Sequence, residues 1–124
     1  MFRLEKKGLE LCEKCGVKNP EWVVDPTLLL SAEEYRTLYK KDKYVRHIKK
    51  KYIFIYLVMT QTIKYNLDYV YNFAKKNDLE VIYVAEDKSI DNYTKYYPTI
   101  PEWLYLVDNA DFVLTNSFHG TVFS

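Results

Sequence analysis

The sequence predicts an α/β fold with Rossmann-like parallel sheets, and three features carry this prediction. Apolar runs of strand length at 52–58, 80–85 and 111–115 alternate with segments of helical periodicity. Near-continuous apolar runs are typical of parallel strands that are buried on both faces. The last run stops at small polar residues around His119, a pattern that indicates a strand, a tight turn and a helix start. Strands alternating with helices imply right-handed crossovers between neighbouring strands.

Composition narrows the classes of function. The 124 residues are 48% hydrophobic and 28% charged, which is ordinary for a globular protein, and the net charge of +1 gives no field that favours nucleic acid. Thirteen tyrosines fall mostly in apolar periodic segments, which favours packing in the core and at its rim over a sugar-stacking surface. The longest apolar run is too short to span a bilayer and no signal peptide is visible, so we expect a cytoplasmic protein.

The first segment, residues 4–15, has the spacing of an amphipathic helix that stops at Gly16. Cys12 and Cys15 form a C-x-x-C pair on its apolar side, which we interpret as two buried free thiols. A redox pair or half of a zinc site is the alternative, but the chain has no second cysteine pair and its two histidines lack ligand-like spacing. We therefore expect no metal.

Residues 22–24 predict a short buried strand that ends at Asp25, which precedes a proline. Asp25 either caps the following turn, the interpretation we favour, or serves as a catalytic carboxylate at a strand end. Ser31 and Glu34 have the spacing of a capping box, which predicts a helix to about Tyr39.

The charged run at 40–51 predicts a solvated connector between two domains, residues 1–45 and residues 46–124. Contact with anionic lipid or a lipid-linked acceptor is a second interpretation of this run, and contact with nucleic acid a third.

The rest of the chain alternates between strands and helices. We expect a strand at 52–58, a helix at 63–76, a strand at 80–85, a polar loop at 86–99, a helix that starts at Pro101, a strand at 111–115 and the start of a further helix. Asn77 should end the helix at 63–76 in the left-handed conformation. Phe112, Val113 and Leu114 should be buried in the last strand, and Phe118 and Phe123 should lie in the core.

The turn after the last strand is the expected functional site, because ligands of open parallel sheets bind at the carboxyl ends of strands and helix amides attract anions. His119 is the candidate catalytic residue, as a hydrogen-bond donor to a phosphate or as a general acid or base. Ser117 and Thr121 offer hydroxyls, although Ser117 can also merely cap the helix. Asn116 can hold the turn, and Gly120 either permits close backbone approach or meets a packing need.

A resemblance rests on the same residues. Residues 110–124 read ADFVLTNSFHGTVFS, which resembles the signature A-D-x-V-x-T-[DN]-S-F-H-G-x-x-F-S of the polysaccharide pyruvyl transferase family. The DPTLLL segment at 25–30 and IPEWL at 100–104 are similar to further parts of that family. An Arg-Glu pair that members often carry near this start is broken here around Arg3, which puts the role of that arginine in doubt.

The resemblance implies a two-domain, GT-B-like transferase that moves a pyruvyl group from phosphoenolpyruvate to a sugar hydroxyl of a polysaccharide or lipid-linked glycan precursor. Residues 1–45 would then close the N-terminal Rossmann-like domain with its connector helix, and residues 46–124 would open the C-terminal, donor-binding domain. It implies catalysis by His119, donor binding by Asn116, Ser117, Gly120 and Thr121, and no cofactor or metal. A lipid-linked acceptor would bring the protein to the inner face of the membrane.

The chain stops on what should be the first turn of a helix, and family members are longer, so we expect a fragment that is inactive by itself. Two other classes stay open. One is a glycosyltransferase that uses a nucleotide-sugar, and the other is a non-catalytic α/β remnant or binding module. The absence of a glycine-rich phosphate-binding motif weakens a nucleotide site.

Overall fold

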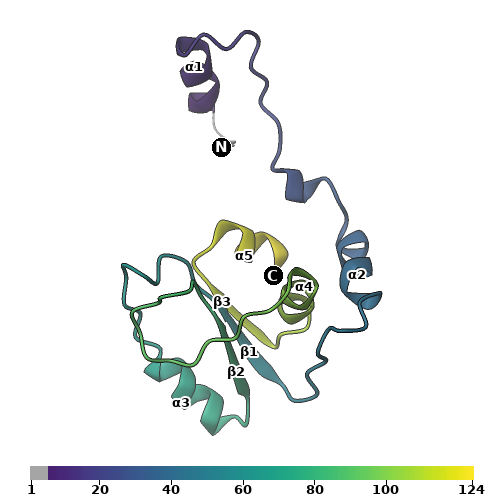
Figure 1. Cartoon of the computed structure of the whole chain (residues 1–124), viewed down its shortest axis with the longest axis vertical. Coiled ribbons are helices and arrows are strands. Elements are labelled where there is room, and N and C mark those ends of the chain that lie inside the picture. The colour runs from purple at the N-terminus through teal and green to yellow at the C-terminus, as the bar shows by residue number, and fades with distance from the viewer. Residues whose placement is uncertain (1–5) are drawn as a thin grey trace. The chain divides into compact units, whose positions relative to one another are not determined.

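The structure is a computed structural model that describes residues 6–124, so Arg3 lies outside the described part (Figure 1). The chain divides into two compact units, Met1–Tyr35 and Arg36–Ser124. The described elements are α1 (Lys6–Lys14), η1 (Pro26–Leu28), α2 (Ala32–Lys40), β1 (Tyr52–Tyr56), α3 (Asp68–Lys76), β2 (Glu80–Val84), α4 (Ile100–Asp108), β3 (Phe112–Thr115) and α5 (Phe118–Phe123).

The helix predicted at the start of the first unit is present as α1. It ends before Gly16, whose φ of 83° is the left-handed conformation that glycine adopts without strain. The prediction that Cys12 and Cys15 are buried is wrong, because both are exposed free cysteines and α1 buries none of its residues. A unit of this size is below the ~40 residues that usually sustain a hydrophobic core, so it has no interior for the thiols.

The strand predicted at 22–24 is also wrong. These residues are in no strand, and Trp22, Val23 and Val24 are 54%, 51% and 54% exposed. β-propensity needs a neighbouring strand to bond with, and every strand of the described residues lies in the second unit.

The local caps of the first unit agree with the sequence. The Asp25 carboxylate accepts hydrogen bonds from the backbone N–H of Thr27 at 2.9 Å and from its hydroxyl at 2.6 Å, which confirms the capping role. Ser31 and Glu34 form the expected capping box before α2, with N–H groups of each bonded to the side chain of the other.

The second unit contains one parallel sheet with strand order β2-β1-β3, which confirms the α/β class. The central strand β1 is buried because it has a neighbour on each side and helices over both faces. Ile53, Ile55 and Leu57 face α3 in one core cluster. On the other face, Phe54 and Tyr56 meet Trp103 of α4, with ring centroids 6.0 and 5.2 Å apart. Figure 1 shows α3 on one side of the sheet and α4 with α5 on the other.

Two residues of β3 are more exposed than the sequence predicts. Phe112 is 51% and Leu114 is 37% exposed, although both were expected in a buried strand. The register aligns them with Ile53 and Ile55, so they belong to the face that α3 covers. β3 lies at the edge of this sheet, and α3 packs mainly over β1 and β2. Phe73 of α3 reaches Phe112, with ring centroids 5.8 Å apart, but covers this face of β3 only in part. Phe118, expected in the core, is 52% exposed as well.

The charged run at 40–51 belongs to the second unit and is largely exposed, although parts of it pack against α4. Val45 is buried, and the backbone N–H of Ile48 donates to the hydroxyl of Tyr105 at 3.1 Å. Just before the run, the Arg36 guanidinium lies 2.7 Å from the Asp108 carboxylate at the end of α4 and holds its pKa below the usual range. The proposed domain boundary after residue 45 stays a prediction.

Smaller differences concern α3. This helix begins at Asp68, five residues later than the periodicity predicts, because residues 57–67 form a loop after β1. The left-handed residue behind the helix is Asp78, with φ 54°, and not Asn77, which has φ −106°. Within residues 6–124, no helix combines the length and apolarity that crossing a bilayer requires.

Candidate functional site at the carboxyl ends of β1 and β3

The carboxyl ends of β1 and β3 lie side by side, since the two strands pair from Ile53 with Phe112 to Tyr56 with Thr115. The chain leaves β1 toward α3 on one face of the sheet, and it leaves β3 into α5, which packs with α4 on the other face. In parallel sheets the loops diverge at such a switch in direction and leave a crevice where ligands bind. The structure therefore places residues 116–121 at a position suited to a ligand.

The turn after β3 has the predicted strand-turn-helix form. The Thr115 hydroxyl accepts the backbone N–H of Ser117 at 3.0 Å, and the Ser117 hydroxyl oxygen accepts the N–H of Gly120 at 3.4 Å. Ser117 is thus the N-cap of α5, as one interpretation of the sequence held. Its hydroxyl still has a proton to donate, because it acts here as an acceptor.

His119 is the second residue of α5 and its side chain is exposed. Its ring lies edge-on to that of Phe118, with centroids 5.3 Å apart. An exposed imidazole at the carboxyl edge of the sheet can reach a bound substrate, either as a hydrogen-bond partner or in proton transfer.

Gly120 is buried against the last residue of β3. A Cβ atom at this position would lie 3.0 Å from the Cβ of Thr115. Cβ atoms in proteins rarely come this close to another side-chain atom. The structure thus gives Gly120 a packing role. Thr121 is exposed, and its hydroxyl donates to the backbone carbonyl of Ser117 at 3.1 Å.

Asn116 bridges to the loop after β1. Its Oδ1 accepts the backbone N–H of Val58 at 2.9 Å, and its Nδ2 donates to the Val58 carbonyl at 3.1 Å and to the Tyr65 hydroxyl at 2.8 Å. Val58 and Tyr65 were not expected as neighbours of the site. Val58 ends the strand expected at 52–58, so its place at the carboxyl edge of a parallel sheet was an available signal, whereas Tyr65 was expected within a helix and carried none.

The other candidate residues belong to a different unit from this turn, which lies in Arg36–Ser124. Asp25 belongs to the first unit, as do Cys12 and Cys15. Within the described part of the chain, no group of three or more His, Cys, Asp or Glu side chains is arranged to hold a metal ion.

A polar cluster in the loop before α4 was not foreseen. Asp91 is 7% exposed and accepts hydrogen bonds from Tyr83 at 2.9 Å, from Ser89 at 2.8 Å and from Lys95, whose ammonium also forms an ion pair with it. Burial by itself would raise the pKa of Asp91, but the hydrogen bonds from Lys95, Ser89 and Tyr83 outweigh burial and lower it to about 2. The cluster fixes this loop against β2.

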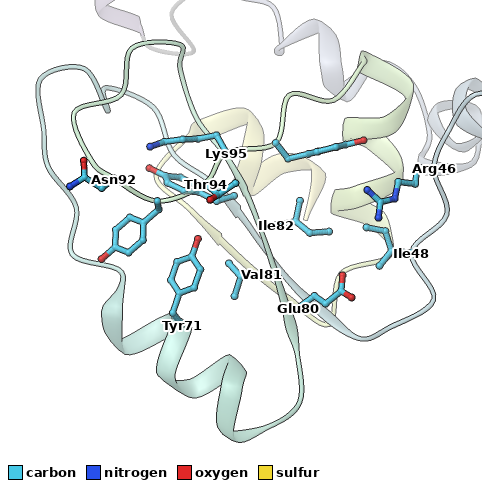
Figure 2. A pocket seen from close by; sticks show the side chains of 12 residues that line it. Arg46, Ile48, Tyr71, Glu80, Val81, Ile82, Asn92, Thr94 and Lys95 are labelled. Carbon is cyan, nitrogen blue, oxygen red and sulfur yellow. The ribbon is translucent and has the colours of Figure 1, made fainter.

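The same loop borders a cavity of about 480 Å³ along β2 (Figure 2). Tyr71 extends into it from α3, and Arg46 lies at its other end. The lining contains none of the residues expected at the functional site and consists of Arg46, Ile48, Tyr71, Glu80, Val81, Ile82, Tyr83, Asn92, Tyr93, Thr94, Lys95 and Tyr96.

Comparison with known proteins agrees with the family resemblance. The family model described as polysaccharide pyruvyl transferase matches residues 5–124. The comparisons with curated proteins and with solved structures returned no match.

Proposed function

Because this chain belongs to the polysaccharide pyruvyl transferase family, we propose that it takes part in moving a pyruvyl group from phosphoenolpyruvate to a sugar hydroxyl. The acceptor in this proposal is a polysaccharide or a lipid-linked glycan precursor, and the chain forms part of a two-domain, GT-B-like enzyme. The observation that carries the proposal is the exposed His119 at the carboxyl end of β3, beside the end of β1.

The proposed reaction needs no redox partner. C3 of phosphoenolpyruvate gains a proton, a sugar oxygen bonds to C2, and the C2–O bond to phosphate breaks as phosphate leaves. A second sugar hydroxyl then bonds to C2 and completes the ketal. Of the two hydroxyl protons, one balances the proton gained by C3 and the other balances the proton taken up by the departing phosphate. The protein must therefore hold a phosphate and a carboxylate and move protons.

In this proposal, His119 hydrogen-bonds the phosphate or transfers a proton. The hydroxyls of Ser117 and Thr121 lie on the same turn, and in this proposal both donate to phosphoenolpyruvate. The Thr121 hydroxyl turns away from the Ser117 carbonyl to do so, because that carbonyl accepts its proton in the structure. Gly120 lets the turn pack closely on β3, and Asn116 shapes it. No cofactor or metal takes part. We propose a cytoplasmic enzyme that meets a lipid-linked acceptor at the inner face of the membrane.

The donor is tested by direct comparison. The complete two-domain protein is incubated with a glycan acceptor and either phosphoenolpyruvate or a panel of nucleotide-sugars, and both phosphate release and product mass are measured. We expect phosphate release and a ketal product with phosphoenolpyruvate alone. Sugar transfer from a nucleotide-sugar would replace this proposal with a glycosyltransferase, and no transfer from any donor would favour a non-catalytic role.

The chain of 124 residues is assayed in parallel. We expect no turnover, because a two-domain transferase needs both walls of its cleft. Ketal formation by this chain alone would contradict the two-domain part of the proposal.

A further inference from the structure

We propose that Asn116 is a positioning residue, which holds the turn carrying His119 against the loop after β1 instead of contacting the donor. The catalytic part of this inference rests on the proposed function. Its geometric part rests on hydrogen bonds between segments that are 58 residues apart in the chain.

The Asn116 carboxamide extends the pairing of β1 with β3 beyond the last residues of the strands. Strand pairing ends with Tyr56 and Thr115. Two residues after β1, the N–H and carbonyl of Val58 are both bonded by Asn116, which accepts the N–H at 2.9 Å and donates to the carbonyl at 3.1 Å. At the opposite end of β3, the Asp111 carboxylate accepts the N–H of Tyr52 at 3.0 Å. A side chain therefore closes each end of this ladder.

Both hydrogen-bond donors of Asn116 are engaged by these contacts. The Val58 N–H can only donate, so it requires the Oδ1 atom and thereby sets the orientation of the amide. Both hydrogens of Nδ2 are then engaged, one by the Val58 carbonyl and one by the Tyr65 hydroxyl. An anionic donor needs hydrogen-bond donors from the protein, and Asn116 has none left for it.

The loop after β1, which Asn116 bonds, is fixed by its own hydrogen bonds and by burial. Met59 has a φ of 64°, which is uncommon for a residue other than glycine, and its carbonyl accepts the N–H of Ile63 at 2.9 Å. Thr60 is fully buried, and its carbonyl accepts the N–H of Ile90 at 2.9 Å. The loop is therefore a firm support for the turn.

The turn between β3 and α5 is also conformationally restricted. Ser117 follows Asn116 directly, is bonded through its N–H to the Thr115 hydroxyl, and caps α5. His119 comes two residues later, within the first turn of that helix. The position of Asn116 therefore sets the position of His119, and a displacement of about 1 Å at a reacting group can lower turnover by about 100-fold.

Two substitutions separate positioning from donor contact. Asn116→Ala removes every contact and should lower kcat for pyruvyl transfer by about 100-fold, with little change in the KM for phosphoenolpyruvate. Asn116→Asp keeps an acceptor for the Val58 N–H but loses the bond to the Val58 carbonyl. Its second oxygen can accept the proton of the Tyr65 hydroxyl, which otherwise lies 3.3 Å from that carbonyl. This variant should therefore recover part of kcat. A strong rise in the KM for phosphoenolpyruvate in Asn116→Ala, which removes the amide without adding a charge, would place residue 116 against the anionic donor and overturn the proposal.

The matched control is Asp111→Ala, which removes the equivalent link at the end of β3 away from His119. It should lower the melting temperature while leaving kcat near that of the wild type. An equal loss of kcat in Asp111→Ala and Asn116→Ala would assign the effect to general destabilisation of β3 and contradict positioning.

The hydrogen bond between Asn116 and Val58 can also be tested without any reaction. Amide hydrogen exchange is measured in the complete protein, where the Val58 N–H should be protected in the wild type and in Asn116→Asp, and should exchange faster in Asn116→Ala. If phosphoenolpyruvate is not the donor, this result still supports the link between the loop and the turn. Unchanged protection of Val58 in Asn116→Ala would overturn it whatever the reaction is.

Discussion

Gly120 of α5 lies against Thr115 of β3 so closely that a Cβ atom at residue 120 would stand 3.0 Å from the Thr115 Cβ, and nearer still to its Oγ1. The contact joins the end of the strand to the helix that carries His119. Packing at this one residue therefore influences the geometry of the candidate site.

We predict that Gly120→Ala destabilises the protein by about 1–3 kcal/mol, the usual cost of overpacking, and lowers turnover because the turn must shift. Denaturant unfolding of the wild type, Gly120→Ala, Thr115→Ala and the double variant gives the coupling between the two residues. Thr115→Ala removes the closest atoms, so the double variant should be less destabilised than the sum of the single ones. Strict additivity would show that the clash is relieved elsewhere.

The second prediction concerns His119. His119→Ala should lower pyruvyl transfer by about 10²- to 10⁴-fold, the usual contribution of a general acid or base, and change stability by no more than about 0.5 kcal/mol since the side chain is exposed. His119→Asn keeps a hydrogen-bond donor but cannot carry a proton, so activity recovered by Asn alone would assign the residue to phosphate binding. His47→Ala, at the chain's other histidine, is the control that should retain turnover. Full activity in both His119 variants would remove this residue from the mechanism.

The third prediction is a pH dependence of stability from Asp91. Its pKa in the folded protein is about 2, below its value of about 3.9 in an unfolded chain. The stability from its charged form is therefore fully present above about pH 5 and is lost as the pH falls toward 2. For the wild type we expect about 2 kcal/mol of loss from this group over that window, measured by urea unfolding at several pH values.

Asp91→Asn should not show this loss of unfolding free energy between about pH 5 and pH 2. At neutral pH it should be destabilised by about 3–5 kcal/mol, because it leaves the Lys95 ammonium, only 10% exposed, without its charged partner. Asp87→Asn, at an exposed aspartate of the same loop, serves as the control and should keep the acid transition of the wild type. Identical pH profiles for the wild type and Asp91→Asn would contradict the buried ion pair.

The fourth prediction follows from the exposure of Cys12 and Cys15. Both thiols should react with a thiol reagent in the native protein, before any denaturant is added. Replacement of both by alanine should change the free energy of unfolding by less than about 0.5 kcal/mol, and the purified protein should contain no zinc. Stoichiometric zinc, or thiols that react only after unfolding, would contradict this prediction.

Much of the site was predictable because its chemistry is local in the chain. The apolar run before Thr115, the cap at Ser117 and the histidine two residues later are close in sequence, and the structure confirms the strand, the turn and the helix there. The pairing of Asn116 with Val58 and Tyr65 was not predictable, since only the strand order places the end of β1 beside the end of β3.

The sequence by itself determined the α/β class and the local caps, such as Asp25 with Thr27 and Ser31 with Glu34, because these contacts span only two or three residues. Tertiary structure alone decided which strands are neighbours and which apolar residues are covered. Strand order placed β3 at an edge, so Phe112 is half exposed despite its strand-like run. It also brought Asn116 beside Val58, because hydrogen bonds between distant segments form only where the assembled sheet places their groups together.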